Sequence, residues 1–481
     1  MNTHAPSRHS RHITARNTFT LVTRRDFLRV GALTIGGLAL TPLLRTRASA
    51  ATTAAADASA PAPAPKATAK TVIQLFLSGG PSHTDTFDPK PNAGADITGP
   101  WRQTVKTNVP GIEINALLPL IAKQADKYTI LRGMSHGINA HETATYMMQT
   151  GTEPTGGLSY PSVGAVIAYE LEAAGALKNL ALPPYIMTPV PLGRFSETGF
   201  LGPNYRSFIP GNLGDPISPA ERKHIENRDA LCTDLDALDH TEKAVFEQAD
   251  YYRDKAKEMI LGKSRVAFDI SLEDAKTRAL YGDSQFGRAC LQARRLAEHG
   301  VPFITVNFPQ WDTHKDQAQR YKKLMPALDS AFSALVADLA QRGLLASTIV
   351  TLGGEFGRTP KFMTEPPWNG GRGHYGPAFS WVVAGGGFQP GKVIGETDAR
   401  SEYVIKRGIA PWDMSASIYK LMGIDPAGVL PHPLGYTVPV IPKSSATAEI
   451  RNTSSSKAAK TAKRAKGVTP GEGILKEIMP A

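Results

Sequence analysis

The clearest hydrophobic pattern along the chain lies in residues 301–354. The segment VPFITVNF (301–308) is apolar and rich in β-branched and aromatic residues, which predicts a buried strand. Apolar residues then recur at three- and four-residue spacing over 324–339, which predicts an amphipathic helix that Gly343 can close. STIVTLGG (347–354) predicts a second strand. A strand, a helix and a strand at this spacing indicate a crossover unit, so the two strands are expected to be parallel.

Four further segments have readable patterns. TVIQLFLSGG (71–80) predicts a buried strand followed by a glycine turn, and SWVVAGGGF (380–388) predicts another strand. MSASIYKLMGI (414–424) predicts a short helix. SHGINAHETATYMMQTG (135–151) reads as a loop that enters a helix near His141. Together these patterns predict an α/β domain over residues 71–442, with the charged, helix-rich residues 215–300 as a helical insert or cover.

The net charge of +11 belongs to the two ends of the chain. Residues 1–50 contain eight arginines and one acidic residue, and residues 443–481 contain eight Lys/Arg and three Glu, so the body is near neutral. The tail 443–481 is rich in Ser, Ala and Lys, and we expect it to be disordered. It has no interleaved aromatic residues, so we expect no nucleic-acid partner.

The first fifty residues have the features of an export signal. Arg24 and Arg25 precede a Gly-rich apolar stretch and an A-x-A sequence at residues 48–50, which predicts a twin-arginine signal peptide over residues 1–50. The apolar stretch is shorter than the roughly 20 residues of a spanning helix, although an uncleaved anchor stays an alternative. Residues 51–70 form an Ala/Pro linker. We therefore expect a periplasmic or extracellular protein with no transmembrane segment after signal cleavage.

The two cysteines, Cys232 and Cys290, are too few for a disulfide scaffold. They could form one bridge in an oxidising compartment, but buried thiols are the interpretation that we adopt.

Side chains that bind metals follow the ends of the predicted strands. In an open parallel sheet, ligands bind at the carboxyl ends of the strands, so these side chains should converge on one edge although they are far apart in sequence. The metal-binding side chains are those of Asp312, His314, Glu355, His83 and Asp85, and Arg358 is expected at the same edge. Imidazole and carboxylate ligands together suit zinc, manganese or iron. The sequence therefore predicts a divalent metal site, with Zn or Mn and one or two ions.

Three further residues have two readings each. The glycine-rich segment NGGRGHYGPAFS (369–380) contains His374 and can either reach the sheet edge or form a flexible turn. His141 lies where a helix N-terminus can bind an oxyanion, but it can equally be a surface histidine beside an N-cap. Arg358 can hold an anionic substrate, or it can fix its own loop through a carboxylate such as Glu355.

The motifs GGPSHTDTFDPKP, WDTH and GEFGRTP, together with the export signal, resemble the twin-arginine-exported domain-of-unknown-function 1501 family. The resemblance covers nearly all of residues 70–440. This family is grouped with the alkaline phosphatase and sulfatase-like superfamily. The resemblance implies a three-layer α/β/α sandwich with a large, mostly parallel sheet.

The resemblance also implies roles for individual residues. Asp312, His314 and His374 are similar to the set that binds one metal in the superfamily, and Glu355 stands where an acid serves a second metal. Phe356 follows Glu355, so one ligand of that second pair is missing. Gly79 and Gly80 occupy the place of a metal-binding Asp, which leaves His83 or Asp85 as substitutes.

His141 stands ten residues before Gly151, in the nucleophile position of the superfamily. The resemblance therefore makes it a ligand, a general base or a histidine nucleophile. The chain has no C-x-P-x-R sequence, so formylglycine sulfatase chemistry is not supported.

These observations predict an exported, metal-dependent hydrolase of phosphate or sulfate esters. Its partner would be a small anionic ester or a sulfated or phosphorylated polysaccharide, with His141 and Arg358 as the catalytic candidates. The alternative is a non-catalytic, metal-binding accessory protein that binds a polysaccharide or a partner at the cell exterior, because a fold does not fix a function.

Overall fold

The computed structural model describes residues 65–154, 157–192, 197–211, 213, 215, 217–236, 253–441 and 473–480. These residues belong to one unit, Ala64–Ala481. The predicted signal peptide, most of the predicted linker and the side chain of Cys232 lie outside the described residues. The side chain of Cys290 is a buried free thiol. Among the helices described here, none has the length and apolar character needed to span a bilayer.

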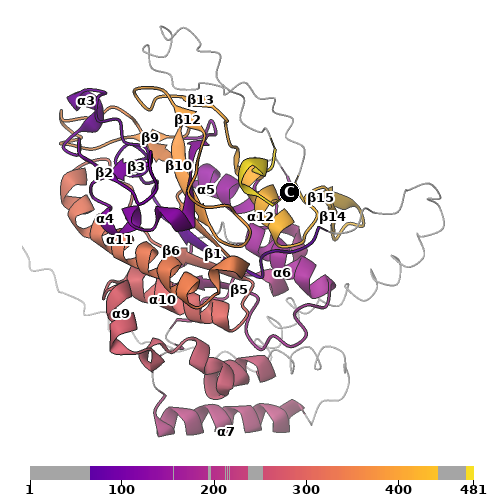
Figure 1. Ribbon diagram of the computed structural model, residues 1–481. Coiled ribbons are helices and arrows are strands. Elements are labelled where there is room, and N and C mark those ends of the chain that lie inside the picture. The colour runs from indigo at the N-terminus through magenta and orange to yellow at the C-terminus, as the bar shows by residue number, and fades with distance from the viewer. Residues whose placement is uncertain are drawn as a thin grey trace, which may run out of the picture. The chain divides into compact units, whose positions relative to one another are not determined.

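A seven-stranded sheet forms the centre of this unit, in the order β11-β4-β10-β7-β1-β6-β5 (Figure 1). β1 lies between β6 and β7 and pairs with both of them in parallel, and β5 is parallel to β6. β10 runs antiparallel between β7 and β4, and β11 is parallel to β4. The strands are β1 Thr71–Phe76, β4 Tyr128–Met134, β5 Tyr185–Thr188, β6 Phe303–Asn307, β7 Thr348–Gly353, β10 Phe379–Ala384 and β11 Val393–Ile394.

Helices cover both faces of the sheet, and the side chains of β1 show the two layers. Ile73 and Leu75 join a core cluster with residues of α4 (Pro119–Ala122), α10 (Gln285–Glu298) and α11 (Gln317–Gln341). Val72 and Phe76 point the other way, because side chains alternate along a strand. They join a second cluster with residues of α5 (His141–Thr150), α6 (Val163–Ala173) and α12 (Pro411–Leu421) (Figure 1). The predicted three-layer sandwich with a mostly parallel sheet is confirmed.

The predicted crossover unit is present as β6, α11 and β7. Its two strands are parallel, as predicted, but β1 lies between them. All residues of both strands are buried, which fits their continuous apolar sequence.

Short elements complete the described fold. Four two-stranded ribbons pair β2 (Thr104–Lys106) with β3 (Glu113–Asn115), β8 (Gly357–Arg358) with β9 (His374–Tyr375), β12 (Glu396–Thr397) with β13 (Val404–Lys406), and β14 (Val429–Pro431) with β15 (Thr437–Pro439). Further α-helices are α3 (Ala95–Thr98), α7 (Pro219–Asp236) and α9 (Ala275–Tyr281). Of the segment predicted as an insert, α7 lies beside the main body, whereas α10 packs against β6 (Figure 1).

A buried network of charges joins α10 to its neighbours. Arg294 is fully buried, and its guanidinium pairs with Glu273 at 2.6 Å, Glu298 at 2.6 Å and Asp338 at 2.9 Å. Arg295 also pairs with Glu273, and Arg342 pairs with all three carboxylates, so three guanidinium groups balance three acids. Arg294 is the fully buried cation of this network, and its removal would leave the inner side of the carboxylates without a partner.

Residues 473–480 pack against α12, which corrects the prediction of a disordered tail for this segment. Leu475 and Ile478 are fully buried. The backbone nitrogen of Leu475 donates to Ser417 Oγ at 2.9 Å, and Gln389 N donates to the carbonyl of Ile478 at 2.7 Å. The apolar residues in this short stretch supply the anchors that the preceding Ser/Ala/Lys-rich residues lack.

Candidate metal centre

Four segments that are distant in sequence meet at one edge of the sheet. Asp312 follows β6 and Glu355 follows β7, and these parallel strands end at the same edge. His374 precedes β10 rather than following it, and it reaches this edge because β10 runs in the opposite direction. His141 is the first residue of α5. The expected convergence therefore exists, and one reversed strand is part of its cause.

Three of these residues form a cluster suited to a cation. His141, Asp312 and His374 each offer a ligand atom, and these atoms all lie within 4.8 Å of one another. His141 Nε2 is 3.5 Å from Asp312 Oδ2, and His374 Nε2 is 3.2 Å from Asp312 Oδ1.

The orientation of both imidazoles leaves Nε2 available for a metal. His141 Nδ1 lies 2.5 Å from Glu355 Oε1, and His374 Nδ1 lies 2.8 Å from the carbonyl oxygen of Asn139. Both oxygens can only accept, so Nδ1 carries a proton in each ring, and the neutral imidazole has its lone pair on Nε2. Among the described residues, His141 Nε2 is buried with no hydrogen-bond partner. Histidines that bind metals are held in this way by a carboxylate or carbonyl, so the residues present fit a divalent ion.

Glu355 supports the cluster from behind rather than joining it. Its carboxylate is buried and accepts the backbone N–H of Gly79, at 2.9 Å and 3.1 Å to its two oxygens, as well as the proton of His141. The prediction that Glu355 is itself a metal ligand is therefore corrected: its oxygens are used to orient His141 and to fix the turn after β1. The backbone carbonyl of Glu355 accepts a hydrogen bond from His136 Nε2 at 2.7 Å. Burial lowers the pKa of His136 to about 4.

The carboxylates make this spot favourable for positive charge. Partial burial alone would lower the pKa of His141, but Asp312 and Glu355 outweigh it and raise this pKa to about 9. Burial would raise the pKa of Asp312, but the neighbouring His141, His374 and Arg358 hold it well below its usual range. The cluster thus favours a positive charge, which is present either when His141 is protonated or when a metal ion is bound.

Phe356 forms an apolar floor beneath both imidazoles. Its ring is fully buried, with its centroid 4.9 Å from that of His141 and 4.7 Å from that of His374. Sequence reasoning noted Phe356 only as a missing ligand. Its position directly after Glu355 was the available signal for an apolar contact at the site.

His314 lies at the rim of the cluster. Its Nδ1 is 2.7 Å from Asp312 Oδ1, and its ring stacks on Trp368 with centroids 5.5 Å apart. Partial burial, together with the nearby charge of Arg358, lowers the pKa of His314 despite the carboxylate of Asp312. His314 Nδ1 also lies 3.5 Å from Arg358 Nη1, which can only donate to it. His314 is not one of the three residues whose ligand atoms converge.

His83 and Asp85 do not reach the cluster, so their prediction as metal ligands is corrected. Asp85 forms a buried, two-point ion pair with Arg372, at 2.7 Å for both contacts, and also accepts from Gln317 Nε2 at 2.8 Å. His83 is buried, with Nε2 3.1 Å from the carbonyl oxygen of Ser401, and burial lowers its pKa. Both side chains stabilise the loop that follows β1.

Arg358 is also displaced from its predicted catalytic role. Its side chain is fully buried, and it pairs with Asp312 at 2.5 Å rather than with Glu355. A guanidinium without exposed surface cannot bind a substrate directly, so Arg358 positions Asp312.

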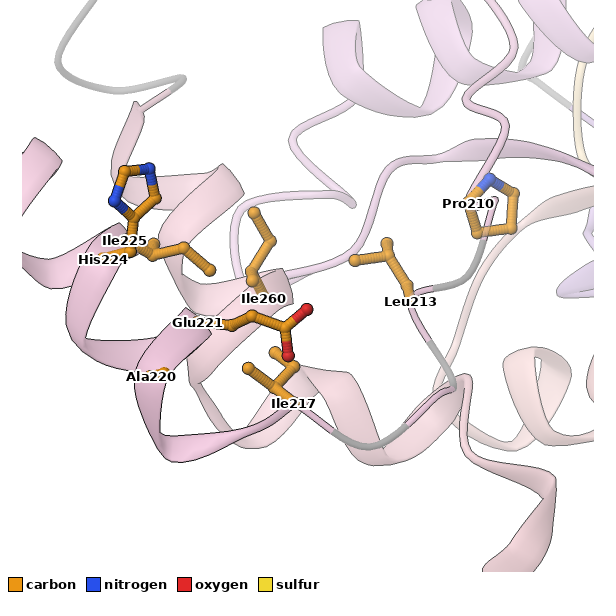
Figure 2. Close-up of a pocket in the computed structure, with 8 residues that line it drawn as sticks. All are labelled: Pro210, Leu213, Ile217, Ala220, Glu221, His224, Ile225 and Ile260. Carbon is orange, nitrogen blue, oxygen red and sulfur yellow. The ribbon is translucent and has the colours of Figure 1, made fainter.

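A hollow of about 590 Å³ lies beside α7 (Figure 2). It is lined mainly by apolar side chains of α7 and of residues 210–217, together with Ile260. Ile217, Ile225 and Ile260 line it together with Glu221 (Figure 2). None of the cluster residues contributes to its lining, so the hollow and the candidate metal centre are separate features.

The fold and the site together define a class: an α/β/α sandwich with a His–Asp cluster at the carboxyl edge of its sheet. The chain belongs to the family described as "Protein of unknown function (DUF1501)", whose model matches residues 69–450. The predicted membership of the domain-of-unknown-function 1501 family is thereby confirmed, and twin-arginine export stays a prediction. No curated protein matches the sequence.

Several solved structures are similar to the chain at low sequence identity. A protein in the alkaline phosphatase superfamily from Vibrio parahaemolyticus is 10% identical, with 75% of this chain and 68% of that chain covered and a TM-score of 0.37. The PsFucS1 sulfatase from Pseudoalteromonas sp. is 13% identical, with 75% and 68% covered and a TM-score of 0.36. The phosphonate monoester hydrolase SpPMH from Silicibacter pomeroyi is 11% identical, with 75% and 74% covered and a TM-score of 0.31. The function proposed below therefore rests on the residues of this chain.

Proposed function

We propose that this protein is an exported, metal-dependent hydrolase of phosphate or sulfate esters. The observation that carries the proposal is the orientation of His141 and His374, whose Nε2 atoms both face the carboxylate of Asp312. Two nitrogens and one oxygen form a ligand set that suits Zn or Mn. Three protein ligands are typical of catalytic rather than structural metal sites.

A divalent ion held by His141, Asp312 and His374 would supply a Lewis acid for the oxygen atoms of an anionic ester. The chain itself supports this chemistry from several sides. Glu355 holds the proton on His141 Nδ1 and so keeps Nε2 directed at the cluster. Phe356 keeps water from the inner side of both rings. The side chain of Asp312 is 45% exposed, so an ester on a larger molecule can reach the outer side.

The N-terminus of α5 adds a second feature suited to an anion. His141 begins this helix of ten residues, and the N-cap residue, Ala140, has no side chain that could cap it. The positive end of the helix dipole therefore lies at the cluster, where it favours the negative charge of a phosphoryl or sulfuryl group. Export by the twin-arginine route is part of the proposal, and it rests on the sequence of residues 1–50.

The test combines metal analysis with an activity assay on the purified exported chain. We expect bound Zn or Mn in the wild type and cleavage of at least one member of a panel of chromogenic phosphate and sulfate esters. The double variant Asp312→Ala, His374→Ala should lose both. The matched double control Asp316→Ala, His224→Ala removes an aspartate and a histidine that are exposed and outside the cluster, and it should lose neither.

Two outcomes would contradict the proposal. A wild type without metal, or a metal content that the cluster variant leaves unchanged, would remove the centre. Bound metal without cleavage of any ester would instead support the accessory, metal-binding role.

A further inference from the structure

The guanidinium of Arg358 is enclosed by main-chain oxygens. Its Nε donates to the carbonyl of Gly80 at 2.9 Å, and Nη1 donates to that of Arg372 at 3.2 Å. Nη2 donates to the carbonyls of Gly79 and, at 3.3 Å, of Trp311. The four oxygens come from the turn after β1, the loop after β6 and the residue before Gly373. Such an oxygen cage is an environment that hard cations prefer.

One carboxylate completes the cage and links it to the cluster. Asp312 Oδ1 lies 2.5 Å from Arg358 Nη2, while Oδ2 of the same carboxylate faces His141 Nε2 at 3.5 Å. Oδ1 also lies 3.2 Å from His374 Nε2, so the carboxylate of Asp312 is shared between a fixed cation and the candidate metal position.

At Gly79 and Gly80, the turn after β1 can offer a cation only carbonyl oxygens, because there is no room for side chains. A Cβ at Gly79 would lie 2.2 Å from the backbone nitrogen of Asp312, and one at Gly80 would lie 2.5 Å from the ring of Phe356. Both glycines also have positive φ angles, of 114° and 78°. A carboxylate ligand cannot be accommodated at either position, so the end of β1 can serve a cation only through its main chain.

We propose that the guanidinium of Arg358 is the built-in second cation of this centre, and that the chain consequently binds one metal ion rather than two. The inference rests on the metal centre of the proposed function. A second divalent ion near Oδ1 of Asp312 would meet a fixed positive charge, and the oxygens it needs are already used by the guanidinium. Arg358 is thus a positioning residue that sets both the charge of Asp312 and the number of ions.

The experiment counts metal ions per chain. The wild type is equilibrated with Zn or Mn, and the excess ion is removed. Inductively coupled plasma mass spectrometry should then find one metal ion per chain. Arg358→Ala empties the oxygen cage, and in the presence of Ca²⁺ it should bind one more ion than the wild type does. Guanidinium ion, far below the concentration that unfolds proteins, should displace this extra calcium from Arg358→Ala and leave the wild type unchanged.

Two variants serve as controls. Arg358→Lys keeps a positive charge in the cage and should retain the ion count of the wild type. Arg400→Ala removes an arginine that is 45% exposed and pairs with Asp96 and Glu402, so it should also leave the count unchanged.

Two ions in the wild type would overturn the proposal without the need for any variant. A folded Arg358→Ala that gains no calcium would overturn it as well, and if this variant does not fold, a second ion in Arg358→Lys would do so. Failure of the proposed function gives a different result. A wild type without Zn or Mn would contradict the metal centre, whereas the calcium gained by Arg358→Ala would still report on the cage.

Discussion

The hydrogen bond between Glu355 and His141 offers a direct test of how the cluster is organised. The carboxylate of Glu355 accepts from His141 Nδ1 at 2.5 Å and from Gly79 N at 2.9 Å and 3.1 Å. Glu355→Gln preserves the shape of the side chain but replaces one acceptor oxygen by an NH₂ donor. The amide oxygen can face either His141 or Gly79, so one of these N–H groups then faces another donor. His141 consequently loses its fixed orientation in part of the molecules.

The loss of a hydrogen bond that orients a metal-binding histidine typically reduces metal affinity by about 10- to 100-fold. This range corresponds to roughly 1.4 to 2.8 kcal/mol of binding free energy. Since the contact here is short and Glu355 is buried, we expect the upper half of this range.

Isothermal titration calorimetry measures the affinity for Zn²⁺ of the wild type, of Glu355→Gln and of the control Glu396→Gln. Glu396 lies on β12, and its side chain is 48% exposed, so its substitution should leave the affinity unchanged. Thermal unfolding without metal checks that Glu355→Gln is folded. A folded Glu355→Gln with the affinity of the wild type would refute the assignment of Glu355 as the residue that orients His141.

Three further outcomes follow from the described contacts and from the sequence. Because the pKa of His136 is about 4 in the folded state and about 6.5 in unfolded chains, only the unfolded state gains the proton between these values. Stability should therefore fall by about 3 kcal/mol as the pH drops through this window, and urea unfolding of His136→Gln, which still donates but does not titrate, should show a smaller pH dependence. Arg294→Ala should lower the free energy of unfolding by about 3 kcal/mol, the lower end of the range for a broken buried ion pair, because Arg295 and Arg342 still pair with the three carboxylates. A loss below about 1 kcal/mol would contradict the network described above. The double variant Arg24→Lys, Arg25→Lys keeps the charge but alters the predicted signal, so cell fractionation should find the chain retained in the cytoplasm, and unchanged export would exclude the twin-arginine route.

The sequence predicted the part of the fold that depends on local pattern. The strand, helix and strand over residues 301–354 follow from runs of apolar residues and from helical spacing, and the convergence of Asp312 with Glu355 follows from parallel strands. The order of the strands was not predictable in this way. Nothing in the local sequence indicates that β1 lies between β6 and β7, or that β10 runs in the reverse direction.

The roles of individual site residues depended on contacts that no spacing encodes. Glu355 was expected to bind metal, but a backbone N–H from Gly79 and the imidazole of His141 use its oxygens. Asp85 was expected at the cluster, yet Arg372, from a loop almost three hundred residues later, pairs with it inside the protein. Arg358 and Glu355 are three residues apart in sequence, but Arg358 pairs with Asp312, whereas Glu355 pairs with His141.

The segment 473–480 lies beyond residue 450, where the match to the family model ends. A shortened version that stopped at that match would strip the cover from α12, expose apolar surface beneath Leu475 and Ile478, and leave the hydroxyl of Ser417 without its donor. A version of the protein that ends at residue 450 should therefore be less soluble than one that retains residues 473–480.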